Sequence, residues 1–203
     1  GYSAGYTLTT SSNNILIGDG AGELIAAGQT DTDGTVAIGR SALGALTSGI
    51  GNVAIGYQAL DANATGDYNT SVGYSALGAM ATDGHNANTA VGYQAATALT
   101  TATDSTAIGM QALKTEDVGS RSTAVGTQAL FSQNTASAAN TNNTGVGVFA
   151  GYHNVTGTNN TYVGVSAGLG ASGQSNSSNT AVGSEALKVI TTGDGNTVMG
   201  NSA

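Results

Sequence analysis

The side chains that most often perform catalysis or bind metals are scarce in this chain and are not grouped. Among 203 residues there are two histidines, His85 and His153, and no cysteine. Zinc is usually held by Cys and His, so the sequence predicts no zinc site. The two histidines lie in separate turn-like segments, and no Ser–His–Asp arrangement is indicated. We therefore expect no catalytic residues and no enzymatic activity.

Acidic turns are the next candidates for chemistry. Asp31-Thr-Asp33-Gly34 faintly resembles a calcium loop, and Asp194-Gly195-Asn196 echoes it. Calcium takes about six to eight oxygen ligands, and the chain has neither the EF-hand pattern nor the glycine-rich nonapeptide of calcium-binding β-rolls. We expect polar turns at these positions, with no metal and no cofactor.

Asparagine-rich turns also contain two glycosylation sequons, Asn63-Ala-Thr65 and Asn154-Val-Thr156. A chain this rich in Asn and Thr produces such triplets by chance. The glycine-rich run Gly145-Val-Gly147 is not followed by Gly-Lys-Ser/Thr, so no phosphate-binding loop is predicted.

The charge balance excludes several classes of partner. Charged residues make up 8% of the chain, and the net charge is −8. Nucleic-acid binding needs a basic stripe that neutralises phosphates, and an anionic membrane surface attracts basic segments; the chain has neither feature. No apolar run approaches the roughly 18 residues of a membrane span. We expect no nucleic-acid partner and no membrane insertion.

An internal repeat supplies the elements that would position any site. The segments 52–60, 69–77 and 88–96 are near copies, and each contains a central glycine. Aligning all copies on that residue gives twelve anchor glycines: Gly1, Gly18, Gly39, Gly56, Gly73, Gly92, Gly109, Gly126, Gly147, Gly164, Gly183 and Gly200. Successive anchors are 17 residues apart in seven of eleven intervals, and 19 or 21 apart in the rest. Even-numbered insertions preserve the two faces of a strand, so the repeat predicts a parallel β-solenoid of about twelve 17-residue coils.

The residues before each anchor glycine are typical of a short strand. The residue directly before it is Ile or Val in ten of eleven coils, and the residue three before it is Thr, Val or Ile. β-branched residues at alternate positions are typical of a half-buried strand face, so we expect both to point inward. The residue between them is usually small, as at Ala54 and Ala107, and would face a closely packed neighbour.

Three further positions are nearly constant. All twelve coils carry alanine three residues after the anchor. The anchor glycine itself predicts a bend or a close backbone approach that a Cβ would block. Asparagine dominates four residues before the anchor, where stacked coils would place the amides in a ladder. Asn occupies this position at Asn14, Asn52, Asn69, Asn88, Asn143, Asn160, Asn179 and Asn196.

The narrow interior of a 17-residue coil suggests that identical chains supply further burial, and we expect a homotrimer packed through its small residues. The predicted packing residues are Gly56, Ala59, Gly73, Ala76, Gly92, Ala95, Ala107, Gly109, Ala112, Gly126 and Ala129. Tyr57, Tyr74 and Tyr93 follow three consecutive anchors and form what we call the tyrosine stripe. This stripe is expected either to pack between chains or to stack on host sugar.

The unit Asn-Thr-Ala-Val-Gly-x-x-Ala-Leu resembles the repeats of bacteriophage tail fibres and the YadA-like head repeats of trimeric autotransporter adhesins. Thr35-Val-Ala-Ile-Gly-Arg-Ser-Ala42 and Asn52-Val-Ala-Ile-Gly-Tyr-Gln-Ala59 match the head pattern Ser-Val-Ala-Ile-Gly-x-x-Ala closely. The resemblance covers nearly the whole chain. It implies a left-handed β-roll, three chains side by side, and exposure on a virion or a cell. Longer coils, and Thr in place of Val at eight positions, make the fibre repeats the nearer resemblance.

These observations lead to one interpretation and its alternatives. We interpret residues 1–203 as a single all-β repeat domain, a fragment of a longer fibre. It would be a shaft or spacer of a trimeric virion tail fibre in host attachment, located on a virion or at the extracellular surface. Its main partner would be itself, with a host surface glycan or protein as a further candidate. The alternatives are the head of a bacterial surface adhesin and an ice- or carbohydrate-binding solenoid. Ice binding is disfavoured by the expectation that the threonines point inward.

Overall fold

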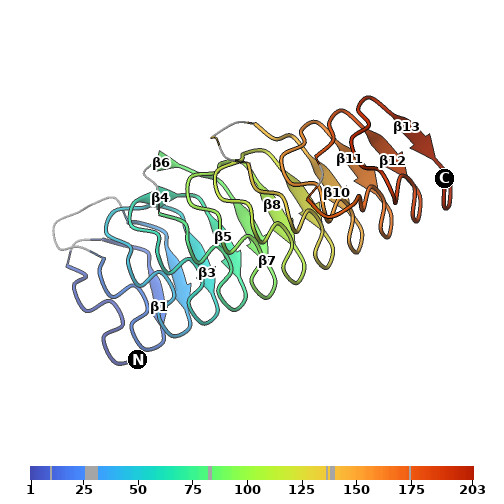
Figure 1. Cartoon of the computed structure of the whole chain (residues 1–203). Coiled ribbons are helices and arrows are strands. Elements are labelled where there is room, and N and C mark those ends of the chain that lie inside the picture. Colours follow the sequence, from blue (N-terminus) through green and yellow to red (C-terminus); the bar gives the residue numbers. More distant parts are fainter. Residues whose placement is uncertain (10, 26–31, 82–83, 136, 138–139, 174) are drawn as a thin grey trace.

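The chain forms a parallel β-solenoid, as the repeat predicts. The computed structural model describes residues 1–9, 11–25, 32–81, 84–135, 137, 140–173 and 175–203. One short strand per coil stacks along one side of an elongated rod, and the two termini lie at opposite ends (Figure 1). Among the described residues there is no helix. The all-β fold class is therefore confirmed.

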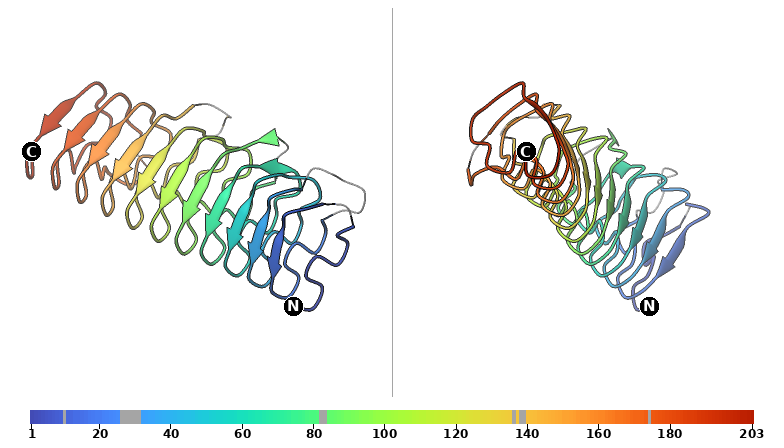
Figure 2. Two further views of the ribbon diagram at one scale, coloured as in Figure 1. Left: turned by 180° about the vertical axis from the view of Figure 1, so that it is seen from behind. Right: turned by 90° about the vertical axis from the view of Figure 1, so that its right-hand side faces the viewer.

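Eleven three-residue strands form a single parallel sheet. In chain order they are β1 (Ile15–Ile17), β2 (Val36–Ile38), β3 (Val53–Ile55), β5 (Thr70–Val72), β7 (Thr89–Val91), β8 (Thr106–Ile108), β9 (Thr123–Val125), β10 (Thr144–Val146), β11 (Thr161–Val163), β12 (Thr180–Val182) and β13 (Thr197–Met199). A second sheet pairs β4 (Gly66–Asp67) with β6 (Gly84–His85). The strand direction turns steadily from β1 to β13 (Figure 2), as the twist of β-sheets requires.

The register of strand pairing is constant, although the coils differ in length. Val53 pairs with Thr70 across a 17-residue coil, Thr70 with Thr89 across 19 residues, and Thr123 with Thr144 across 21. Equivalent positions of the repeat therefore always face each other. The extra residues of the longer coils fall outside the strands, as the even-numbered insertions predict.

The interior of the solenoid is lined by the small residue at the centre of each strand. Ala37, Ala54, Ala90 and Ala124 are completely buried, whereas the residues on either side of them are partly exposed. The prediction that the flanking Thr, Val and Ile side chains point inward is therefore wrong. The physical reason is volume: in many coils a buried leucine four residues after the anchor, such as Leu60, fills the narrow interior and leaves room for little more than a methyl group.

Two of the coils that lack this leucine carry a larger residue at the strand centre instead, Leu16 and Tyr162. Leu16 lies 2.8 Å from the place where a Cβ on Gly22 would sit, and Tyr162 lies 2.7 Å from the equivalent place on Gly151. The ring of Tyr162 also fills the space next to Gly168. In this way a large residue at the strand centre fills the space that glycine leaves inside its own coil or the neighbouring one.

The anchor glycines stack on one another through their backbones. The anchors from Gly18 to Gly200 have φ between 129° and 138°, a region that L side chains rarely adopt. A Cβ on Gly56 would lie 2.5 Å from the carbonyl oxygen of Gly73, the next anchor. The close backbone approach predicted for the anchor glycine is confirmed.

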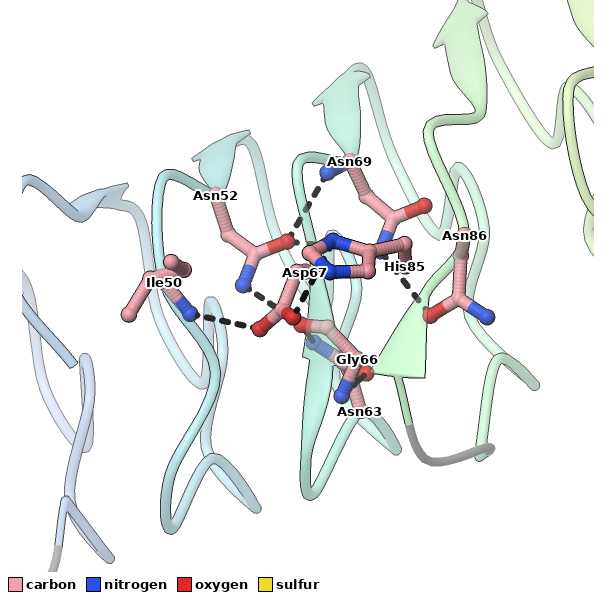
Figure 3. Close-up of polar contacts among 8 residues, drawn as sticks. All are labelled: Ile50, Asn52, Asn63, Gly66, Asp67, Asn69, His85 and Asn86. Atoms are coloured by element: carbon pink, nitrogen blue, oxygen red, sulfur yellow. Dashed lines mark hydrogen bonds and ion pairs between the residues drawn. The ribbon is translucent and has the colours of Figure 1, made fainter. Parts of the chain in front are cut away.

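Side-chain ladders connect the coils beside the strands. The Oδ1 atom of Asn52 accepts a hydrogen bond from the backbone N–H of Asn69 at 2.9 Å, and its Nδ2 donates to the carbonyl of Gly66 at 2.7 Å (Figure 3). The same bond joins Asn143 to the N–H of Asn160 at 2.9 Å. The predicted asparagine ladder is confirmed, and its Oδ1 atoms accept mainly from backbone N–H groups that would otherwise be buried without a partner.

Candidate interaction surface

The outer face of the large sheet is the most extensive repetitive surface of the rod. It has two columns, which we name the threonine column (three residues before each anchor) and the aliphatic column (directly before each anchor). Alternate residues of a strand share a face, so both columns point away from the buried alanines. The aliphatic column includes Ile55 at 36% and Ile108 at 40% exposure.

The threonine column runs unbroken through the C-terminal two thirds of the rod. It consists of Thr70, Thr89, Thr106, Thr123, Thr144, Thr161, Thr180 and Thr197, which pair in register from strand to strand. Val36 and Val53 take the same place nearer the N-terminus. With ten steps of about 4.8 Å between eleven strands, the outer sheet face is roughly 50 Å long. Monomeric proteins rarely expose contiguous apolar patches of more than a few hundred Å², so the aliphatic column is the candidate contact surface of the rod.

The tyrosine stripe lies just beyond the C-terminal ends of β3, β5 and β7. The ring centroids of Tyr57 and Tyr74 are 5.1 Å apart with 16° between the planes, and those of Tyr74 and Tyr93 are 5.4 Å apart with 25°. The guanidinium of Arg40 lies over the ring of Tyr57 at 5.9 Å. The predicted stripe therefore exists as a stack in which the rings cover one another's faces.

The predicted packing residues all lie inside a single chain. Ala59, Ala76, Ala95, Ala112 and Ala129 are completely buried, and Ala107 is 1% exposed. The anchors Gly73, Gly92, Gly109 and Gly126 stack backbone on backbone as Gly56 does. Placing these residues between identical chains was wrong, because their neighbours are other coils of the same chain. The surface open to a partner is the outer sheet face.

Four aromatic side chains gather at one corner of the rod, where sequence reasoning did not expect a site. We call Phe131, Phe149, Tyr152 and His153 the aromatic corner. The rings of Phe131 and Tyr152 are parallel, with centroids 4.9 Å apart, and Phe149 and His153 meet Tyr152 edge-on at 5.6 and 4.6 Å. Both phenylalanines of the chain are here, which is the signal that the sequence contained.

The two histidines are far from forming one site. Nδ1 of His85 lies 3.6 Å from a carboxylate oxygen of Asp67, and its ring stacks on Tyr68 at 5.2 Å. Figure 3 shows His85 and Asp67 beside the asparagine ladder. His153 belongs to the aromatic corner, several coils away. In the part of the chain that the structure describes, no three His, Cys, Asp or Glu side chains are grouped as metal ligands.

The carboxylates of the acidic turns accept hydrogen bonds from backbone N–H groups of the preceding coil. Asp33 accepts hydrogen bonds from the N–H and the hydroxyl of Ser12, and Asp194 accepts one from the N–H of Ser177. Asp67 does the same for the N–H of Ile50 at 2.9 Å. Each of these carboxylates therefore binds the preceding coil, a contact that the sequence pattern did not reveal. Asp31 lies outside the described residues.

The asparagines of both sequons are buried, and their side-chain amides make hydrogen bonds within the chain. Asn63 donates to the carbonyl of Gly66 and accepts from its N–H, each at 2.9 Å. Asn154 makes the same pair of bonds with Gly157. Each closes a tight turn, so neither amide is presented for glycosylation.

Comparisons with known proteins found no counterpart: no family model, no curated protein and no solved structure matches this chain. Of the described residues, none belong to a helix long and apolar enough to cross a membrane. The fold and the geometry of the surface therefore carry the functional argument.

Proposed function

We propose that this chain is a shaft or spacer segment of a homotrimeric fibre, with the outer sheet face of each chain packed against its two copies. The observation that carries the proposal is the aliphatic column, which leaves Ile or Val side chains partly exposed along the rod. Burying what remains exposed of each such side chain contributes about 1 kcal/mol, and a trimer repeats that gain in every coil.

The shape of the surface favours copies of the same chain as partner. A partner that follows the outer sheet face over its whole length must have the same coil spacing and must turn with the strands, and an identical solenoid meets both conditions. The resemblance of the repeats to phage tail fibres supports a place in a virion tail fibre that attaches to a host. An adhesin head at a bacterial surface uses the same architecture and is the alternative within this class. The proposal includes no enzymatic activity.

Light scattering tests the assembly directly. The purified chain is expected at close to three times its own mass of 19.6 kDa. The double variant Ile108→Lys and Val125→Lys places two charges in the aliphatic column, and we expect it to remain a folded monomer. The control Thr97→Lys places the same charge at a turn position that Lys114 occupies in the following coil, and should leave the mass unchanged. A wild-type monomer at low micromolar concentration would contradict the trimer.

Ice binding is a second candidate that the structure brings forward. The reason for setting it aside was the expectation that the threonines point inward, and they point outward. Their hydroxyls make no hydrogen bond within the described part of the chain, so they are free to order water. The turning of the strands (Figure 2) opposes the match to a flat lattice that ice binding needs. A thermal hysteresis measurement on the monomeric Lys variant and on the wild type separates the two candidates.

A further inference from the structure

The aromatic corner forms one wall of an open hollow of about 260 Å³, lined by Phe149, Tyr152, His153 and Leu169. Phe131 covers one face of the Tyr152 ring and does not line the hollow. The other face of that ring is therefore turned toward the hollow and the following coil. Among the described residues, Phe131 is the only ring that stacks in parallel on Tyr152, and Tyr152 itself lines the hollow.

The repeat explains why a hollow exists at this place. Phe149, Tyr152 and His153 stand two, five and six residues after their anchor, Gly147. In the next coil the same three positions hold Ser166, Leu169 and Gly170. Large rings are followed by smaller residues, so the surface steps down between the two coils.

We propose that this hollow binds a neutral pyranose, such as the terminal sugar of a glycan. Binding sites for small molecules are mostly aromatic and apolar, with a few polar groups that fix orientation. The hollow has this composition: two aromatic rings and Leu169 offer an apolar surface for the C–H face of a sugar, and the imidazole of His153 offers a hydrogen bond to a hydroxyl. No carboxylate, lysine or arginine is among the four lining residues, which favours an uncharged ring over an acidic sugar.

Two other features fit a sugar less well. In the tyrosine stripe, Tyr74 is stacked between two rings, and Tyr57 lies between Tyr74 and the guanidinium of Arg40. Tyr93 ends the stack but lines none of the three hollows. Two more hollows flank Asp61 where Gly44 and Gly78 remove a side chain from the turn, and neither is lined by an aromatic residue. Of the three hollows, only the one at the aromatic corner combines aromatic rings with a polar side chain.

All four lining residues come from one chain, so the inference does not require the proposed trimer, although it names a partner class for the proposed host attachment. Saturation-transfer NMR with methyl β-D-galactopyranoside and methyl β-D-glucopyranoside tests it, with a methyl glycoside of N-acetylneuraminic acid as the charged comparison. We expect the ring C–H protons of at least one neutral glycoside to be saturated by the wild-type protein. The mass of the same samples is measured by light scattering, so a failed trimer and a failed sugar site are distinguishable.

The rings of the aromatic corner can be replaced by residues that occupy the same repeat positions in other coils, and such variants are expected to keep the fold. Phe149→Ser introduces the residue found at the same position in Ser41 and Ser75, and Tyr152→Thr introduces that of Thr97. Each should reduce saturation at least fivefold, and thermal melts confirm that the variants are folded. Tyr68→Ser removes an exposed aromatic ring elsewhere on the rod and should leave the signal unchanged.

Three results would overturn the proposal. One is the absence of saturation for both neutral glycosides. Another is an undiminished signal in folded Phe149→Ser. A third is loss of the signal in Tyr74→Ser while Phe149→Ser retains it, which would move sugar binding to the tyrosine stripe.

Discussion

Coils on either side of the middle of the solenoid have the same backbone but different interiors. Seven residues after the anchor, the N-terminal coils bury apolar side chains at Ile25, Leu46, Met80 and Leu99, with Asn63 as an exception. The next three coils bury Glu116, Gln133 and Asn154 at that position. The strand register does not change across this boundary. The backbone ladders thus set the shape of a coil, and its interior needs only to be filled and fully hydrogen-bonded.

The polar interior is organised around Glu116, whose side chain is completely buried. Its carboxyl oxygens accept five hydrogen bonds: from the N–H groups of Asp117, Gly119 and Thr135, from the hydroxyl of Thr135, and from the amide of Gln133. Gln133 in turn accepts a bond from Asn143 at 2.9 Å. Side chains of three coils therefore depend on one acceptor, whereas the leucines of the N-terminal coils depend on no single partner.

Placing an apolar residue in the polar interior, or a polar one in the apolar interior, should have the largest effect on stability. Glu116→Leu leaves the Gly119 and Thr135 N–H groups without their acceptor and removes one acceptor of the Gln133 amide, so it should lower the free energy of unfolding by about 4 kcal/mol or more. Leu99→Glu, the reverse change one coil earlier, buries a carboxyl group among apolar side chains and should cost a similar amount. Urea denaturation followed by circular dichroism measures both. A Glu116→Leu variant as stable as the wild type would show that the polar network contributes little.

Truncating the inward-facing leucine should have a smaller effect that is equal in the two halves. Leu60→Ala and Leu130→Ala remove completely buried side chains at the same position of the repeat. Each should lower the free energy of unfolding by about 3 kcal/mol, from lost burial and the cavity that remains. The same denaturation experiment serves here. If Leu130→Ala lowered the free energy of unfolding by less than half as much as Leu60→Ala, the interiors of the two halves would differ at this position as well.

Removing one hydroxyl from the polar interior should cost less still. Burial raises the pKa of Tyr162 well above its ordinary range, so the phenol stays protonated and donates to Oδ1 of Asn176. Tyr162→Phe should lower stability by about 1 kcal/mol. Tyr74→Phe, in the partly exposed tyrosine stripe, is the matched control and should change stability by less than about 0.5 kcal/mol. Equal effects of the two changes would argue against a stabilising Tyr162–Asn176 bond.

The smallest expected effect is a pH-dependent change in stability from Asp61, in the N-terminal half. Partial burial raises the pKa of Asp61 above its ordinary value of 3.8. The folded state then binds this proton more tightly than the unfolded state, so Asp61 lowers stability as the pH rises from below 3.8 to above the folded-state pKa. Asp61→Asn should raise the melting temperature slightly at neutral pH and not at pH values well below that range. A variant that gains equally at both pH values would show that the gain does not come from titration.

The sequence alone was sufficient to predict the fold, because the repeat length and its constant positions indicate the geometry of a coil. The anchor glycines, the even-numbered insertions and the asparagine column each predicted a feature that the structure confirms. The orientation of the strand was not predictable in the same way, because neither face of a Thr-Ala-Val strand is charged. Which face is inside depends on how much volume Leu60 and its equivalents occupy, and that volume is set by the closure of the whole coil.

The candidate surfaces were predicted less well than the fold. The tyrosine stripe was found because its residues share one repeat position. The aromatic corner was missed because Phe149, Tyr152 and His153 occupy three different positions and approach one another only when the turn closes. The contacts of Asp33, Asp67 and Asp194 were missed for a related reason: each carboxylate accepts hydrogen bonds from the preceding coil, not from its own turn.

The constant register has a consequence for the length of the rod. Because neighbouring coils pair in register and stack through their anchor glycines, deleting the segment between two equivalent positions joins backbone ends that already match. Gain or loss of whole coils therefore changes the reach of the rod in increments of about 4.8 Å while the backbone contacts stay as they are. Such a molecule can change its length one coil at a time wherever the coils brought together have complementary interiors.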